Sequence, residues 1–115
     1  MRFFERYLDQ TVFQDYEDFK QNYHLKVPED FNYAYDVVDK IAEEDPERLA
    51  MVWCNEAGEE RSFTFREMSE MSQRTANYFH MLGVRKGDVV MVILKRHYQF
   101  WFTILALHRL GAMVA

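Results

Sequence analysis

The chain has 115 residues and a mass of 14.0 kDa, which fits one small domain or part of a larger one and excludes a two-domain protein. Because 49% of the residues are apolar and 17% are aromatic, there is enough material for a hydrophobic core. Fourteen basic against nineteen acidic residues give a net charge of -5, the wrong sign for a protein that binds nucleic acid or an anionic membrane through a basic face.

The cysteine content and the apolar segments of the chain indicate its cellular compartment. The single cysteine, Cys54, excludes an internal disulfide and a multi-cysteine zinc site, and it fits a reducing compartment. Near the N-terminus, Glu5, Arg6 and Asp9 interrupt the apolar stretch that a secretory signal needs. Residues 98–115 are the most apolar segment, but they are too short and too polar to span a bilayer. We therefore expect a cytoplasmic location and no membrane span.

Two amphipathic helices are predicted in the first part of the chain. Apolar residues recur every three or four positions from Phe3 to Tyr23, which is the period of a surface helix. After a polar break that contains Pro28, Asn32 is placed to cap a second helix, which should end before Pro46. The inward face of this second helix is expected to consist of Ala34, Val37, Val38, Ile41 and Ala42.

A hairpin and a long helix are predicted next. Leu49–Cys54 and Arg61–Phe65 are strand-like runs joined by a turn-forming Asn-Glu-Ala-Gly segment, so they should pair antiparallel. Thr64 and Glu67 then form the capping-box pattern of a helix start, and Gly83 is suited to end that helix. The helix face expected to be buried carries Met68, Met71, Thr75, Phe79 and Leu82.

The last third has the pattern of a parallel strand–helix–strand unit. Val89–Leu94 is an almost unbroken apolar run, typical of a strand buried on both faces. Gln99–Leu110 is expected to be helical, and Ala112–Ala115 to form a second strand. The predicted fold class is α/β, with a short antiparallel pair, a parallel crossover and three to four helices in an incomplete layer. Since such strands need neighbours and covering layers, we expect the first part of a longer polypeptide.

Few residues are arranged for chemistry. The four glycines lie too far apart for a phosphate-cradling loop, and Cys54, at the end of a predicted buried strand, should be inert. The histidines lack the spacing of a metal site, and a surface or capping role is expected for each of His24, His80, His97 and His108. Lys95, Arg96 and His97 follow a predicted strand at its carboxyl end, where open α/β sheets bind ligands. Their charge could meet a phosphate or carboxylate, or could simply solvate a turn, which is the simpler interpretation.

Three stretches of the sequence resemble a known family. They are FNYAYDVVDKIAEEDPERLAMVW, RSFTFREMSEMSQRTANYFHMLGVRKGDVVMVIL and the helix ending in HRLGAMVA, which together cover about Phe31 to Ala115. In order and spacing they are similar to the opening of the AMP-forming adenylate ligases, and within them to acetyl-CoA synthetase-like and medium-chain acyl-CoA synthetases. The resemblance implies that residues 1–30 are a helical leader and that residues 31–115 are the first, truncated part of the N-terminal AMP-binding domain.

One corner departs from the family pattern. Family members often read Leu-Pro-Arg after the buried strand and then Pro-Glu and an aromatic residue. Here Arg96 and Trp101 fit that pattern, whereas Lys95, Tyr98 and Gln99 do not. This corner therefore assigns no particular substrate.

The resemblance also implies an activity for the parent protein. A carboxylate would attack ATP to give an acyl-adenylate and pyrophosphate, and the CoA thiol would then displace AMP. ATP, Mg²⁺ and CoA are the cofactors implied for the parent, and a small carboxylic acid is its substrate. The family's phosphate loop, ribose-binding acid, hinge and catalytic lysine match no residue here, so no catalytic, cofactor-binding or metal-binding residue is assigned. The segment is expected to be a scaffold whose partner is the rest of the ligase domain; the alternative is a free-standing, non-catalytic binding module.

Overall fold

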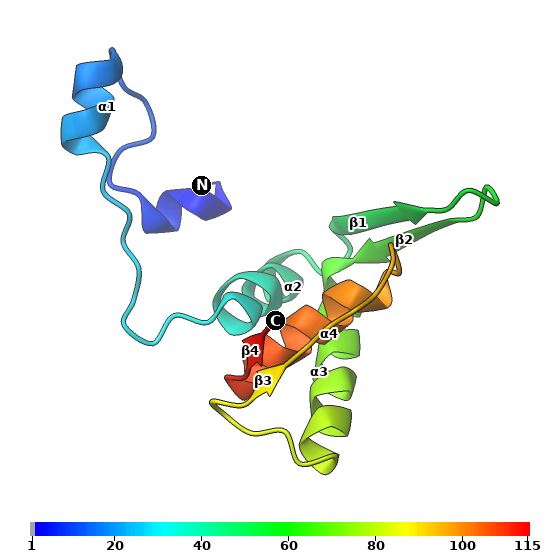
Figure 1. Ribbon diagram of the computed structural model, residues 1–115. Coiled ribbons are helices and arrows are strands. Elements are labelled where there is room, and N and C mark those ends of the chain that lie inside the picture. The colour runs from blue at the N-terminus through cyan, green and yellow to red at the C-terminus, as the bar shows by residue number, and fades with distance from the viewer. Residues whose placement is uncertain (1) are drawn as a thin grey trace. The chain divides into compact units, whose positions relative to one another are not determined.

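The computed structural model of the protein describes residues 2–115 (Figure 1). The chain divides into two compact units, one up to Phe31 and one from Asn32 to Ala115. The described residues combine helices with two small two-stranded sheets, one antiparallel and one parallel. This arrangement confirms the predicted α/β class.

The first unit does not contain the continuous helix predicted from Phe3 to Tyr23. A 3-10 helix, Phe3–Tyr7, and helix α1, Tyr16–Asn22, are separated by an irregular stretch. The carboxylate of Asp15 accepts a hydrogen bond from the backbone N–H of Asp18 at 2.9 Å and so starts α1 afresh. The spacing of apolar residues predicted one helix here because it continues, without a break, through two separate elements.

The second predicted helix is present and is wound in two ways. A π-helical segment, Ala34–Asp39, runs directly into α2, Lys40–Glu44, which stops before Pro46 as predicted. The side-chain oxygen of Asn32 accepts from the backbone N–H of Ala34 at 3.0 Å, which confirms the predicted cap. Of the expected inward face, Ala34, Val38 and Ile41 are buried, whereas Val37 and Ala42 are half-buried.

The hairpin and the helix after it follow the prediction closely. Strands β1, Leu49–Cys54, and β2, Glu60–Thr64, pair antiparallel. Helix α3, Phe65–Met81, opens with the predicted capping box: the backbone N–H of Glu67 donates to Thr64 Oγ1 at 3.2 Å, and that of Thr64 donates to the Glu67 carboxylate at 2.8 Å. Gly83 follows the helix in the left-handed conformation, with φ of +100°.

The buried face of α3 differs from the predicted one. Its fully buried residues are Met68, Ser69, Ser72 and Ala76. Leu82, predicted to be in the core, is 61% exposed, and Met71, Thr75 and Phe79 are only half-buried. The two serines are buried because their hydroxyl groups have hydrogen-bond partners inside the unit. A prediction based on apolar residues alone passes over such positions.

The predicted parallel crossover is also present. Strand β3, Val89–Val90, pairs in parallel with β4, Met113–Val114, and helix α4, Gln99–Leu110, connects them before ending at Gly111. Two further hydrogen bonds, Ala115 N–H to the Val90 carbonyl and Val92 N–H to the Ala115 carbonyl, continue the ladder.

The prediction that Val89–Leu94 is buried on both faces is wrong for the described residues. Val89, Met91 and Ile93 are 64%, 72% and 81% exposed. Val90 and Val92, which alternate with them, are half-buried. A strand that is apolar on both faces needs a covering layer on each side, and residues 2–115 supply a layer for one face only.

The core of the second unit lies where α3, α4 and the hairpin meet, with α3 and α4 side by side (Figure 1). The rings of Phe63 in β2 and Phe102 in α4 meet edge to face with centroids 5.5 Å apart. The buried cluster consists of Ala34, Val38, Phe63, Met68, Phe102 and Leu105. In residues 2–115 no helix is long and apolar enough to cross a membrane.

Candidate functional site

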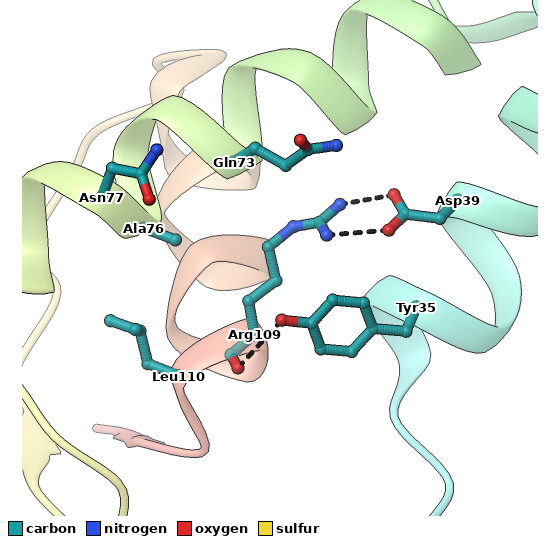
Figure 2. Close-up of a pocket in the computed structure, with 7 residues that line it drawn as sticks. All are labelled: Tyr35, Asp39, Gln73, Ala76, Asn77, Arg109 and Leu110. Atoms are coloured by element: carbon teal, nitrogen blue, oxygen red, sulfur yellow. Dashed lines mark hydrogen bonds and ion pairs between the residues drawn. The ribbon is translucent and has the colours of Figure 1, made fainter.

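A polar pocket of about 360 Å³ lies where residues 34–39, α3 and α4 meet (Figure 2). From the last turn of α4, Arg109 forms a two-pronged ion pair with Asp39, with Nη1 to Oδ2 at 2.8 Å and Nη2 to Oδ1 at 2.5 Å. Arg109 Nε donates to Ser72 Oγ at 2.9 Å, and the guanidinium lies 5.1 Å from the ring centroid of Tyr35. The Arg109 side chain is only 4% exposed, so the pair ties these elements together from inside.

The electrostatics of this pocket are those of a structural ion pair. Burial acts to raise the pKa of Asp39, but hydrogen bonds from Arg109 and Ser69 and the charge of Arg109 outweigh burial and hold the pKa below its usual 3.8. The carboxylate is therefore ionised at neutral pH and its oxygens are occupied. A group in that state stabilises the fold and is not available for proton transfer.

Lys95, Arg96 and His97 lie in the segment between β3 and α4. The sequence predicts them directly after a strand that reaches Leu94, but β3 ends at Val90, so residues 91–94 separate it from Lys95. All three are exposed, and within residues 2–115 their side chains have no hydrogen-bond or ion-pair partner.

The loop is attached to the hairpin by its backbone. Trp53 Nε1 in β1 donates to the carbonyl oxygen of Arg96 at 2.6 Å. Next to this bond, the ring of Tyr98 contacts that of Trp53 edge to face at 5.2 Å, and the Tyr98 hydroxyl accepts from Arg61 Nη1 at 2.8 Å. Arg96 itself has φ of +46°, a conformation that costs a non-glycine residue about 1 to 3 kcal/mol and persists only where its surroundings impose it. Here the bond from Trp53 and the packing of Tyr98 impose it.

A hollow of about 410 Å³ lies between this loop and the edge of β1. One end carries the basic side chains of Arg96 and His97, and the remaining walls are mostly apolar and aromatic. The residues that line the hollow are Val52, Trp53, Cys54, Leu94, Arg96, His97, Phe100 and Trp101. Toward the hairpin turn it opens into a wider depression, which adds Lys95 together with Glu56 and Glu59.

Several predicted residues lie elsewhere or in other surroundings. Cys54 is exposed at the end of β1, so the expectation of a buried thiol is wrong. Alternate residues at this end of the strand face outward, and Cys54 is one of them. Among residues 2–115 no three His, Cys, Asp or Glu side chains gather where they could hold a metal ion. The Asp39–Arg109 pair was missed because its members are 70 residues apart. In the sequence, Arg109 stands out only as a charged residue on a mostly apolar helix.

Comparison with known proteins shows the family. Residues 38–115 match the AMP-binding enzyme family. The chain is 33% identical over 108 residues to human acyl-coenzyme A synthetase ACSM3, covering 89% of this chain and 18% of that protein. It is 42% identical over 94 residues to human acyl-coenzyme A synthetase ACSM2A, covering 76% of this chain and 16% of that protein. The chain therefore belongs to the AMP-binding enzyme family, and it spans less than a fifth of the length of these relatives.

Solved structures agree with the sequence comparison. The acyl-CoA synthetase of Brucella canis matches with a TM-score of 0.67 and 27% identity, over 73% of this chain and 15% of that one. The N-terminal subdomain of NpsA from Klebsiella oxytoca matches with a TM-score of 0.63 and 26% identity, over 73% of this chain and 21% of that one. The chain thus shares the fold of part of each of these proteins, which agrees with the family resemblance.

The prediction of a cytoplasmic location is wrong by this comparison. The acyl-CoA synthetases ACSM3, ACSM2A and ACSM5 that the chain resembles are mitochondrial proteins by name. The prediction rested on the lack of disulfide-forming cysteines and on the polar start of the chain. A low cysteine content argues against an oxidising compartment, but it does not distinguish one reducing compartment from another.

Proposed function

We propose that this chain is the opening part of an ATP-dependent, AMP-forming ligase that joins a carboxylic acid to CoA. The observation that carries the proposal is the match to acyl-CoA synthetases over most of the chain, at 33% to 42% identity. In the proposed reaction the acid displaces pyrophosphate from ATP, giving an acyl-adenylate. The CoA sulfur then attacks the acyl carbon, and AMP leaves as the thioester forms.

The proposal extends to the cofactors and the substrate class. The parent ligase would use ATP and CoA, and Mg²⁺ would neutralise phosphate charge in the first step. Since the relatives are acyl-CoA synthetases, we place the parent in the metabolism of fatty or similar apolar acids. The particular acid is a question for the assay below.

The role proposed for this segment is that of a scaffold. We assign residues 1–30 to a helical leader and residues 31–115 to the first part of the AMP-binding domain, with the catalytic groups of the ligase outside both. The exposed apolar side chains of Val89 in β3 and of Met91 and Ile93 just after it support this role, because an apolar surface of that kind is normally covered. The rest of the ligase domain is the partner we propose for it.

Carboxylate-dependent exchange of pyrophosphate into ATP tests the proposal. The 115-residue chain and the full-length parent would be assayed side by side with acids of increasing chain length. We expect exchange by the parent and none by the segment. Exchange by the segment would overturn the scaffold role, and an inactive parent with every acid would contradict the ligase assignment.

The gene sequence beyond Ala115 separates the proposal from its alternative. A reading frame that continues into a Ser/Thr/Gly-rich phosphate loop supports the ligase. A stop codon directly after Ala115, together with a stable monomer, would support a free-standing, non-catalytic binding module.

A further inference from the structure

The first helical segment of the second unit has an unusual winding. Residues Ala34–Asp39 form a π-helix, in which backbone N–H groups bond to carbonyl groups five residues back, and Lys40–Glu44 continue as an α-helix. π-Helical turns are rare, occur mostly as single turns inside α-helices and are frequent at functional sites. A winding that chains seldom adopt by themselves is stabilised by contacts outside the segment.

The last turn of α4 supplies such contacts at both ends of the segment. At its start, Asn32 Nδ2 donates to the carbonyl oxygen of His108 at 2.7 Å. At its end, the carboxylate of Asp39 accepts from the two Nη atoms of Arg109 at 2.8 and 2.5 Å. The same carboxylate accepts from Ser69 Oγ at 2.7 Å. We call the contacts of Asn32 and Asp39 with His108 and Arg109 the clasp.

Tyr35 connects the middle of the segment to the same turn. Its hydroxyl donates to the carbonyl oxygen of Arg109 at 3.3 Å, and the Arg109 guanidinium lies 5.1 Å from the centroid of its ring (Figure 2). Tyr35 also lines the polar pocket, together with Asp39 and Arg109. The winding of the segment and the shape of this pocket are therefore linked.

The spacing of the two anchored residues favours the π winding. His108 and Arg109 are neighbours in the sequence, whereas Asn32 and Asp39 are seven residues apart. Seven residues of α-helix advance about 10.5 Å along the helix axis, at about 1.5 Å per residue. A π-helix has more residues per turn and advances less per residue, so it brings Asn32 and Asp39 closer to the same turn of α4.

We propose that residues 34–39 are a conformational switch with two windings, and that the clasp selects the π form. Without the clasp, the segment takes the α winding that continues in α2. This change shifts the hydrogen-bond register by one residue, so it rotates the start of the segment by about 100° relative to its end. Tyr35 moves with that rotation, and the polar pocket changes its wall. The inference goes beyond the proposed function, because it does not depend on the parent being a ligase.

Deletion of the half-buried Val37 tests whether the segment contains one residue more than an α-helix needs. Six residues of α-helix advance about 9 Å, so a chain without Val37 can form the clasp in the α winding. We expect its midpoint of urea unfolding to lie close to that of the unaltered chain. The matched control is deletion of Arg74, an exposed residue within the regular helix α3. That deletion turns one half of α3 by about 100° against the other and should lower the midpoint far more.

The winding itself can be measured by NMR, from scalar couplings across the N–H···O=C hydrogen bonds of the 115-residue chain. In the unaltered chain we expect couplings within residues 34–39 to carbonyl groups five residues back. The double variant Arg109→Met/Asp39→Leu removes the ion pair of the clasp and leaves no buried charge unpaired. Its couplings should shift to carbonyl groups four residues back. Arg74→Gln, on the exposed side of α3, should keep the π pattern.

Three results would overturn the inference. They are four-residue couplings in the unaltered chain, five-residue couplings in a folded double variant, and a loss on deletion of Val37 as large as that on deletion of Arg74. Circular dichroism shows whether each variant is folded. If the double variant does not fold, the two deletions decide, because both leave Asp39 and Arg109 in place.

Discussion

The second unit contains two arginines in opposite situations, one in the pocket at the end of α4 and one in the loop before α4. The Arg109 side chain is 4% exposed, and its guanidinium binds Asp39 and Ser72. Arg96 is exposed, its side chain has no partner within residues 2–115, and its backbone has a positive φ. The fold positions the Arg109 side chain with other side chains, and it positions Arg96 through the backbone alone.

This difference separates a structural charge from one that is available to a ligand. Burying a charge is costly unless it is paired and hydrogen-bonded, so Arg109 depends on its partners as much as they depend on it. An exposed, unpaired arginine contributes little to stability, whatever it binds. The two residues should therefore respond very differently to substitution.

The largest expected effect is that of Arg109→Met, which keeps much of the side-chain volume and removes the charge. It leaves Asp39 largely buried without its ion-pair partner, so we expect the free energy of unfolding in urea to fall by about 3 kcal/mol or more. The double variant Arg109→Met/Asp39→Leu should lose less than the sum of the single changes. Arg74→Met on the exposed side of α3 is the control, and an equally small effect at both arginines would contradict the comparison.

The next largest effect is expected from acid, which should weaken the Asp39–Arg109 ion pair. The folded-state pKa of Asp39 lies below its ordinary 3.8, so its stabilisation is complete above that pH and is lost as the pH falls through the folded-state value. Urea unfolding measured from neutral pH down into this range should show a steeper loss of stability in the unaltered chain than in Asp39→Asn. Asp18, whose pKa is lowered by hydrogen bonds from the Gln14 backbone and the Asn22 side chain, contributes to both curves alike. If the stability of the unaltered chain and that of Asp39→Asn fall in parallel with pH, Asp39 is not the group that causes the loss.

A smaller effect is expected at the capping box of α3. Thr64→Ala removes the oxygen that accepts from the Glu67 backbone N–H, and the loss should be about 1 kcal/mol of unfolding free energy. Ser62→Ala, an exposed change in β2, is the matched control and should cost far less. If both variants unfold at the same urea concentration as the unaltered chain, the cap makes no energetic contribution.

Local signals in the sequence predicted much of this fold. The cap at Asn32, the capping box at Thr64 and the helix end at Gly83 each depend on residues within a few positions of one another, and all three are present. The parallel unit of β3, α4 and β4 was predicted in the same way, from apolar runs and turn residues.

The features that the sequence did not predict depend on distant contacts. No local pattern links Asp39 to Arg109, and the burial of Ser72 follows from that pair. The open face of β3 depends on which layers cover it, and an apolar run carries no information about that. Within the candidate site, the sequence placed Lys95, Arg96 and His97 at the end of a strand. It did not show the hollow, because its other wall comes from Trp53 and its neighbours in β1.

The smallest effect on stability is expected at Arg96. Arg96→Gly relieves a left-handed conformation but gives the unfolded chain more freedom, and these two terms are each about 1 kcal/mol and oppose one another. The free energy of unfolding should therefore change by no more than about 0.5 kcal/mol, since an exposed, unpaired charge adds little. Arg96→Ala removes the same charge, keeps the strain and leaves the unfolded chain's freedom nearly unchanged, so it should stay within the same limit. A loss in either variant as large as that of Arg109→Met would show that the Arg96 guanidinium is part of the fold.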